Sequence, residues 1–237
     1  MKFKFISATI VGLILAVTFL PNVANAGLIK SYDFNGDLTD TLGNGVDLLG
    51  LGGSISGGQY HFGAAQGLIM NSALASTTSY AFEVGFSASS WRSGWNSLVN
   101  FSDNGTSDRA LYYNGYQGQG VGVYDYNSST YASGSLLQNT PYVLGFVNNN
   151  GSYTISINGT SVTSYDTNGY TSPSALNTLR FFKDNGSENF AGSVDFIRIH
   201  SDASSFGQVA TVPEPSTLAI FALGMIGLVS RRFKKQA

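Results

Sequence analysis

The sequence contains no cysteine among its 237 residues, and this absence excludes disulfide bonds, thiolate metal ligands and a cysteine nucleophile. Histidine is nearly as scarce, with only His61 and His200. They do not form a zinc-binding cluster, and no Gly-x-Ser-x-Gly elbow precedes a helix to pair with them as a serine hydrolase would require. We interpret both as ordinary surface or edge residues. The fold must be held by its apolar core.

Charge is scarce too, and it is one-sided. Between residues 27 and 212 there are six basic and thirteen acidic residues, which gives this part of the chain a net charge near −7. Nucleic acids are bound by Lys and Arg side chains that neutralise phosphates. The acidic balance therefore excludes a nucleic-acid partner.

The acidic residues lack the pattern of a retaining glycosidase, which needs two carboxylates about 5 Å apart. On a strand, this geometry requires acidic residues at alternate positions facing one cleft. The region contains only two glutamates, Glu83 and Glu188, and Glu83 has no aspartate near it in the sequence. We expect no catalytic residues, so a glycoside hydrolase is the least favoured function.

The N-terminus has the three parts of a secretory signal peptide. Lys2 and Lys4 precede an apolar run over residues 10–20, and the segment ends in the small-x-small sequence Ala24-Asn25-Ala26. This order predicts export, with residues 1–26 removed by cleavage after Ala26. A retained membrane anchor is the less favoured alternative, because the apolar run is short.

The middle of the chain shows period-two apolar patterns rather than helical ones. Every second residue of "YAFEVGFSA" (80–88) is large and apolar, except at its last position, and Asn-Gly pairs separate the later runs. Asn-Gly supplies the positive φ angles of tight hairpin turns. Residues 141–165 therefore predict three strands joined by two turns. The whole pattern indicates an all-β antiparallel sandwich or barrel.

Two stretches resemble the laminin-G-like, concanavalin A-like domains. They are "YDFNGDLTDTLGNG" (32–45) and the pairing of "YVLGFVNNNGSYTISINGTSV" with "ENFAGSVDFIRIH" (142–162 and 188–200). The resemblance implies a two-sheet antiparallel jelly-roll sandwich over residues 27–201, with its first and last strands side by side. Residues 202–212 are small and polar, and we expect an exposed linker there.

The tail "VPEPSTLAIFALGMIGLVSRRFKKQA" resembles the sorting signal of PEP-CTERM proteins. The motif is Pro213-Glu214-Pro215, and an apolar run (218–229) and basic residues follow it to position 237. The resemblance implies an exosortase partner and the envelope or extracellular matrix of a Gram-negative bacterium. The apolar run is shorter than the ~20 residues of a comfortable membrane span, and the basic end would stay cytoplasmic. We expect a short helix that anchors the chain transiently in the inner membrane. A plain C-terminal anchor is the alternative.

Calcium is the one cofactor that the sequence suggests, because carboxylates and Gly- and Asn-rich loops supply its oxygen ligands. Asp40 and Asp195 would converge if the first and last strands pair, as the resemblance implies. Asp103 and Asp108, in "DNGTSD", form a second candidate. The alternative for both pairs is a turn in which the aspartate accepts backbone hydrogen bonds.

Aromatic residues among Asn, Gln and Asp suggest carbohydrate binding, because sugars dock on flat exposed rings. The alternative is that these rings form the core and cross-strand pairs. Two functions remain open: a non-catalytic carbohydrate-binding or adhesion domain, and a structural surface protein that makes protein–protein contacts. The candidate residues for a polysaccharide site are Trp91, Trp95, Tyr112, Tyr113, Tyr116, Tyr124 and Tyr126.

Overall fold

The computed structural model describes residues 27–101, 109–114, 120–123, 131–166, 169, 171–173, 177–184 and 187–206. They belong to one compact unit, Gly27–Gly207, whose core is its own. The predicted signal peptide with its cleavage site at Ala26, and the sorting signal at 213–237, lie outside the described residues. Within the described part of the chain, no helix has the length and apolar character needed to cross a membrane.

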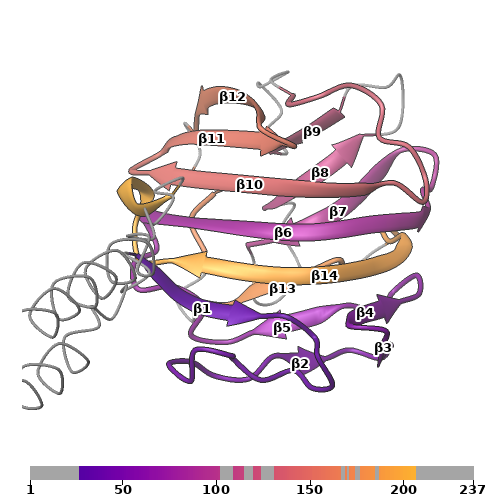
Figure 1. The fold of residues 1–237 in the computed structure, drawn as a ribbon. Coiled ribbons are helices and arrows are strands. Elements are labelled where there is room, and N and C mark those ends of the chain that lie inside the picture. The colour runs from indigo at the N-terminus through magenta and orange to yellow at the C-terminus, as the bar shows by residue number, and fades with distance from the viewer. Residues whose placement is uncertain are drawn as a thin grey trace, which may run out of the picture. The chain divides into compact units, whose positions relative to one another are not determined.

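The unit consists of two antiparallel sheets packed face to face, which confirms the all-β prediction (Figure 1). Sheet A contains, in spatial order, β12 (Thr160–Tyr165), β11 (Ser152–Ile157), β10 (Pro141–Asn149), β6 (Ser79–Ser90), β14 (Ala191–His200), β4 (Gln59–Phe62) and β3 (Ser54–Ser56), and β1 (Leu28–Tyr32) also pairs with β14. Sheet B contains, in spatial order, β2 (Leu49–Gly50), β5 (Leu68–Met70), β13 (Leu179–Phe181), β7 (Trp95–Asn100), β8 (Ala110–Asn114) and β9 (Gly120–Val123).

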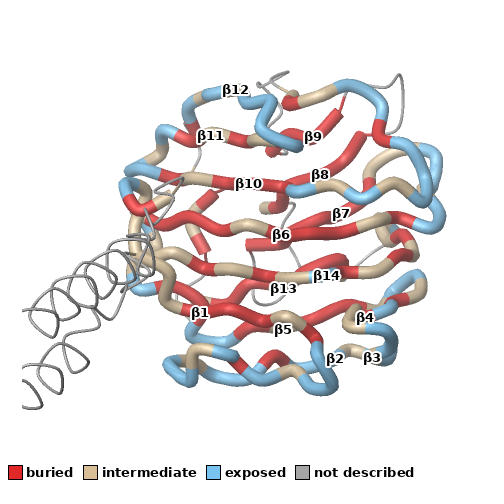
Figure 2. Tube along the Cα trace, in the orientation of Figure 1, coloured by how far each residue is buried: buried red, intermediate tan, exposed pale blue. Residues whose placement is uncertain are grey.

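The core lies between the sheets and is centred on β6. Its alternate residues from Tyr80 to Phe86 are buried, as the period-two pattern predicted. Figure 2 shows most of β6 as buried. The Phe82 ring stacks on Phe146 of β10 at a centroid distance of 5.1 Å. It also meets Phe181 of sheet B edge-on at 6.3 Å, so aromatic contacts join the two sheets.

The three-strand meander at 141–165 is confirmed as β10, β11 and β12. Asn150 and Gly151 turn the first hairpin with φ angles of 52° and 90°, and Asn158 and Gly159 turn the second with 47° and 81°. Two consecutive positive φ angles are what a two-residue hairpin requires. The local sequence therefore determines the register of these strands.

The first and last strands pair, with Tyr32 of β1 opposite Ile197 of β14, as the resemblance implied. β14 also carries a bulge against β6, because its register shifts between Val194 and Phe196. Asp195 is the extra residue, and it is exposed. The ring of Phe196 covers Gly85, where a Cβ atom would lie only 2.5 Å from it. This bulge explains why alternation in "SVDFIRIH" is imperfect.

Residues 202–206, which the sequence predicted as part of the linker, fold onto sheet A instead. The Asp202 carboxylate caps the 3₁₀ turn η2 (Ala203–Ser205) by accepting hydrogen bonds from the backbone N–H groups of Ser204 and Ser205 at 2.8 and 3.0 Å. The Phe206 ring then packs on Gly145 and meets the His200 imidazole at 5.7 Å. We call residues 202–206 the C-terminal clasp.

The clasp should make the stability of the domain depend on pH through His200. Both ring nitrogens are buried, and neither has a hydrogen-bond partner among the described residues. This burial lowers the pKa of His200 from its ordinary value. Arg198 lowers the pKa further, while Glu83 and Asp202 raise it. A depressed pKa means that the unfolded chain takes up the proton first, so stability is lost as the pH falls below about 6.5.

We expect the free energy of unfolding to fall as the pH is lowered below about 6.5, and a His200→Phe variant to lose most of this dependence. Urea titrations at several pH values provide the measurement. An equally steep dependence in the variant would contradict the assignment to His200.

Candidate functional site

A row of polar side chains crosses the outer face of sheet A on adjacent strands. Ser54 of β3 lies opposite His61 of β4, His61 opposite Ser193 of β14, and Ser193 opposite Ser87 of β6. Residues directly opposite one another in antiparallel strands point to the same side. Their chain neighbours Phe62, Val194 and Phe86 are buried in the core, so the row faces outward.

The row lines a shallow depression with a volume of about 540 Å³. Gly192 of β14 lies close to the β6 backbone at this site: a Cβ atom there would lie 2.3 Å from the Ser87 carbonyl oxygen. No Asp, Glu, Lys or Arg is among the described residues that line it. We call this site the polar depression; its lining residues are Gly53, Ser54, His61, Phe62, Gly63, Gln66, Ser87, Ser89, Asn139, Gly192 and Ser193.

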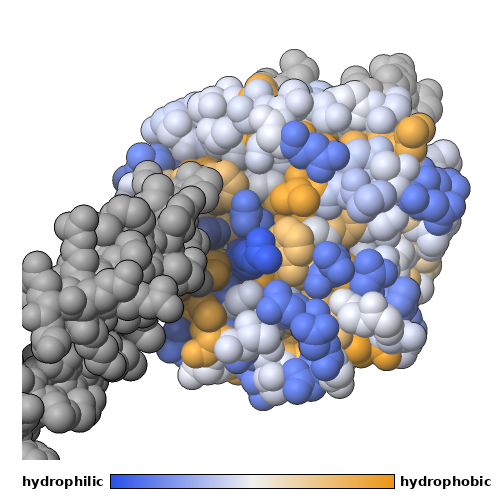
Figure 3. Space-filling model, viewed as in Figure 1, coloured by the Kyte–Doolittle hydropathy of each residue, from blue (hydrophilic) through white to orange (hydrophobic). Residues whose placement is uncertain are grey.

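Charge occurs beside the polar depression rather than in it. Asp195 is exposed on the bulge, two residues from Ser193. Further along β14, the Arg198 guanidinium lies 4.2 Å from the centre of the Phe196 ring and 3.9 Å from the Glu83 carboxylate. Among the described residues, Arg198 is the one Lys or Arg on this face of β14, and it already makes these two contacts. Figure 3 shows the outer face as mostly pale surface with separate blue and orange patches.

Two predicted sugar-binding tyrosines are buried, and the expectation that they offer free faces is corrected. Tyr112 and Tyr113 are 1% and 4% exposed. The Tyr113 ring belongs to the core, where its hydroxyl accepts a hydrogen bond from Leu136 N–H at 3.1 Å. Tyr112 meets Trp95 edge-on at 5.7 Å. The other three tyrosines, Tyr116, Tyr124 and Tyr126, lie outside the described residues.

The two tryptophans are half-buried. Trp91 closes one end of the core, with ring centroids 4.4 Å from Tyr113 and 4.6 Å from Phe190. Its indole N–H is buried without a hydrogen-bond partner in the described part of the chain. The packing of Trp91 is therefore that of a core residue, and its ring is not an open platform.

We expect Trp91→Ala to lower the free energy of unfolding by about 3 kcal/mol, because it removes a large ring from packed aromatic contacts. Trp91→Phe should keep most of that stability. Urea unfolding of both variants measures the effect. A Trp91→Ala variant of normal stability that bound no glycan would instead make Trp91 a ligand contact.

Asp40 has a structural role in the loop after β1. Its Oδ1 accepts hydrogen bonds from the N–H groups of Ser31 and Leu42 at 2.9 and 3.1 Å, and its Oδ2 accepts one from Asn44 N–H at 3.0 Å. The Lys30 ammonium, which donates to the Ser72 carbonyl, provides a nearby positive charge. Burial lowers the Lys30 pKa, while Asp40 raises it.

This geometry is that of the turn alternative. In the described ranges, no three His, Asp or Glu side chains gather in a way that could hold a metal ion. Asp195 lies on the β14 bulge, and Asp103 and Asp108 lie outside the described residues. Calcium binding stays a prediction.

Replacing Asp40 should destabilise the domain whether or not calcium is present. Asp40→Ala removes three charge-assisted hydrogen bonds and the negative charge beside the buried Lys30. We therefore expect the free energy of unfolding to fall by about 3 kcal/mol. Asp37→Ala is the control, because that exposed carboxylate caps only Thr39. Thermal unfolding with calcium and with EDTA measures both. An effect of Asp40→Ala that vanished in EDTA would make Asp40 a calcium ligand.

Comparisons with known proteins identify the tail. Residues 211–235 match the PEP-CTERM protein-sorting motif, which indicates an exported protein that an exosortase processes. A comparison of the sequence with curated proteins finds no significant match.

Solved structures share the fold at low identity. Domain 4 of AbnA, a GH43 extracellular arabinanase from Geobacillus stearothermophilus, in complex with arabinotriose, is 19% identical with a TM-score of 0.52, over 75% of this chain and 94% of that one. Trypanosoma rangeli sialidase is 12% identical with a TM-score of 0.61, over 79% of this chain and 33% of that one. The binding domain of botulinum neurotoxin serotype D is 16% identical with a TM-score of 0.52, over 77% and 50%. These likenesses show the fold alone.

The polar row was missed by sequence reasoning, which treated His61 as an ordinary surface residue. His61, Ser193 and Ser87 each have a buried chain neighbour, and this alternation is typical of strand residues that point outward. Which strands lie side by side was not evident, because β4, β6 and β14 are far apart in the sequence.

Proposed function

We propose that this chain is an exosortase-sorted protein of the Gram-negative envelope or extracellular matrix, and that its domain binds carbohydrate without catalysing a reaction. The observation that carries the proposal is the uncharged polar depression on sheet A. The sorting motif supports the location. We also assign the fold to the laminin-G-like, concanavalin A-like jelly rolls; the pairing of β1 with β14 supports this assignment.

The chemistry of the polar depression suits sugar hydroxyls. Serine hydroxyls donate and accept hydrogen bonds, and the amides of Gln66 and Asn139 add further donors and acceptors. Adjacent strands lie about 4.8 Å apart, so the row repeats at about the length of one sugar unit. An extended polysaccharide crossing β3, β4, β14 and β6 would meet a polar side chain on each.

The charge distribution favours a neutral glycan. No Lys or Arg is among the described residues that line the polar depression, Asp195 lies on the neighbouring bulge, and residues 27–212 have a net charge near −7. A polymer of uronic or sialic acids would be repelled by this field. The complex of the arabinanase domain with arabinotriose supports carbohydrate binding on this fold, without distinguishing the class of glycan.

The domain is expected to bind neutral polysaccharides such as arabinan, dextran or mixed-linkage glucan, and not alginate or polygalacturonate. Ser193→Tyr, which fills the polar depression, should weaken binding by about tenfold or more. Thr154→Tyr is the matched control. Thr154 of β11 lies on the same outer face of sheet A as Ser193, but it does not line the polar depression. Affinity electrophoresis followed by titration calorimetry measures both variants.

The outcomes separate the parts of the proposal. Binding of anionic polymers through the same site would overturn the neutral class while keeping carbohydrate binding. Equal losses in the two variants would place the site elsewhere. No binding to any glycan would overturn the function and leave the structural, protein-contact role.

A further inference from the structure

β12 forms an edge of sheet A that no described strand covers. Its sequence, Thr-Ser-Val-Thr-Ser-Tyr, contains neither charge nor proline, and its pairing with β11 has no bulge. Tyr165 is 62% exposed. Edge strands usually carry lysine, proline or a bulge, which prevents another strand from pairing with them. β12 has none of these features.

The other edges of the described sheets are short or partly paired. β3 has three residues and β2 has two. β9 is met by a bridge in which Val121 and Ala132 exchange backbone hydrogen bonds of 3.0 and 2.7 Å. β12, with six residues, is the longest open edge in the described part of the chain.

The hairpin geometry shows which backbone groups of β12 face outward. The two-residue turn at Asn158-Gly159 makes Ile157 and Thr160 a hydrogen-bonded pair, and such pairs recur at every second residue. Asp166 N–H donates to the Gly151 carbonyl at 2.7 Å, so the same alternation of hydrogen-bonded pairs holds at the C-terminal end of β12. The backbone groups of Ser161, Thr163 and Tyr165 therefore point away from β11.

We infer that a second copy of this chain pairs with β12 in antiparallel orientation. Each hydrogen-bonded pair between the two copies must join residues whose backbone groups point away from β11. The two β12 strands can therefore slide past each other only in steps of two residues. The register that uses all three places Thr163 opposite Thr163 of the second copy, and Ser161 opposite its Tyr165. The same surface serves both copies, as a twofold dimer requires.

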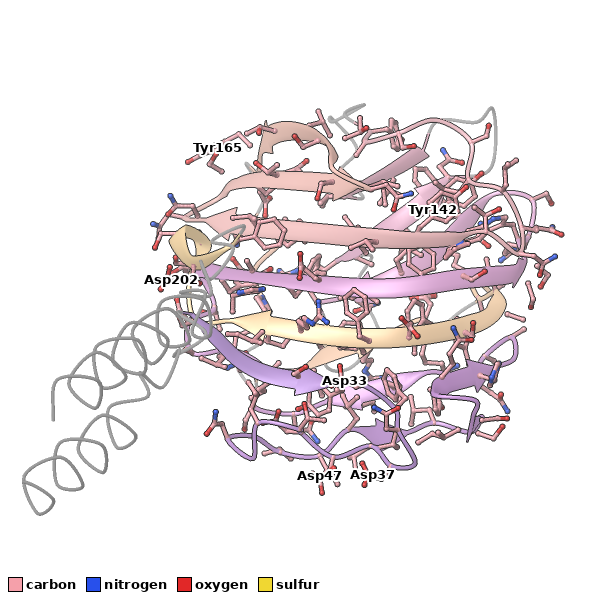
Figure 4. All side chains as sticks on the ribbon, in the orientation of Figure 1. Asp33, Asp37, Asp47, Tyr142, Tyr165 and Asp202 are labelled. Carbon is pink, nitrogen blue, oxygen red and sulfur yellow. The ribbon has the colours of Figure 1, made fainter. Side chains whose placement is uncertain are left out.

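The charge distribution allows this pairing despite the acidity of the domain. Figure 4 places Asp37 and Asp47 at the edge of the domain opposite β12, and Tyr165 projecting outward near the end of β12. Asp166, the nearest acidic residue along the chain, is buried, and its Oδ2 accepts hydrogen bonds from Thr171 N–H and Oγ1–H, both at 2.6 Å. The paired strands would therefore bring no like charges into contact.

The dimer would join two copies of sheet A into one continuous sheet. The twofold axis of such a pair is perpendicular to the sheet, so both outer faces lie on the same side. If the proposed function holds, the two polar depressions then face one polymer surface and bind it with higher avidity than one alone. The pairing itself does not depend on glycan binding.

Sedimentation equilibrium of residues 27–206 tests the pairing, because this unit has its own core. We expect a dimer at protein concentrations on the order of 100 µM, since a single strand pair is a small interface. Thr163→Lys and Thr154→Lys are matched variants: the two side chains share one hydrogen bond of 2.8 Å, but only Thr163 lies on the edge strand. Thr163→Lys should weaken dimerisation by about tenfold or more, and Thr154→Lys should not.

Thr163→Pro is a second test, because it removes an outward N–H and no hydrogen bond to β11. Hydrogen exchange of the wild-type domain avoids substitutions: raising the concentration should protect the amides of Ser161, Thr163 and Tyr165. A wild-type domain that stays monomeric would overturn the inference, as would a dimer that both Thr163 variants leave intact. Glycan binding by a monomer would be unaffected, so this failure is distinct from failure of the proposed function.

Discussion

The alternation of side chains along β6 is the constraint on which the rest of the structure depends. One face of this twelve-residue strand carries Phe82, whose ring contacts both β10 and sheet B, and the other face carries Ser87 and Gly85. A slip of one residue would bury the polar set and expose the aromatic one. The aromatic contacts therefore determine the position of β6, and with it the position of the polar row beside β14.

Local signals in the sequence predicted those parts of the fold that depend on neighbouring residues. Asn158-Gly159 and the aromatic alternation of β6 led to the meander and to the central strand. The bulge at Asp195 was not predicted, because it depends on the packing of Phe196 over Gly85, a contact between distant parts of the chain. The clasp was taken for linker because its stability comes from the Asp202 cap and the contacts of Phe206, not from an apolar repeat.

The candidate site was harder to predict, because the type of a residue does not show whether its side chain is buried. Tyr112 and Tyr113 lie among Asn and Gln residues in a sequence that also suits an exposed surface, yet β8 lies inside sheet B with neighbours on both sides. Conversely, a serine such as Ser193 carries no signal of its own. It becomes a binding candidate only through its place between His61 and Ser87, which the sheet order alone provides.

The polar depression and the C-terminal clasp lie at opposite ends of β14. The polar depression lies near its start, at Gly192 and Ser193, whereas the clasp lies near its end, where Phe206 covers His200. At about 3.3 Å per residue, these points are roughly 25 Å apart along the strand. Gly27 also lies at the clasp end, where its carbonyl accepts a hydrogen bond from Ser201 N–H at 2.6 Å. Gly27 and Phe206, the first and last described residues, therefore lie at the same end of β14, away from the surface around Ser193.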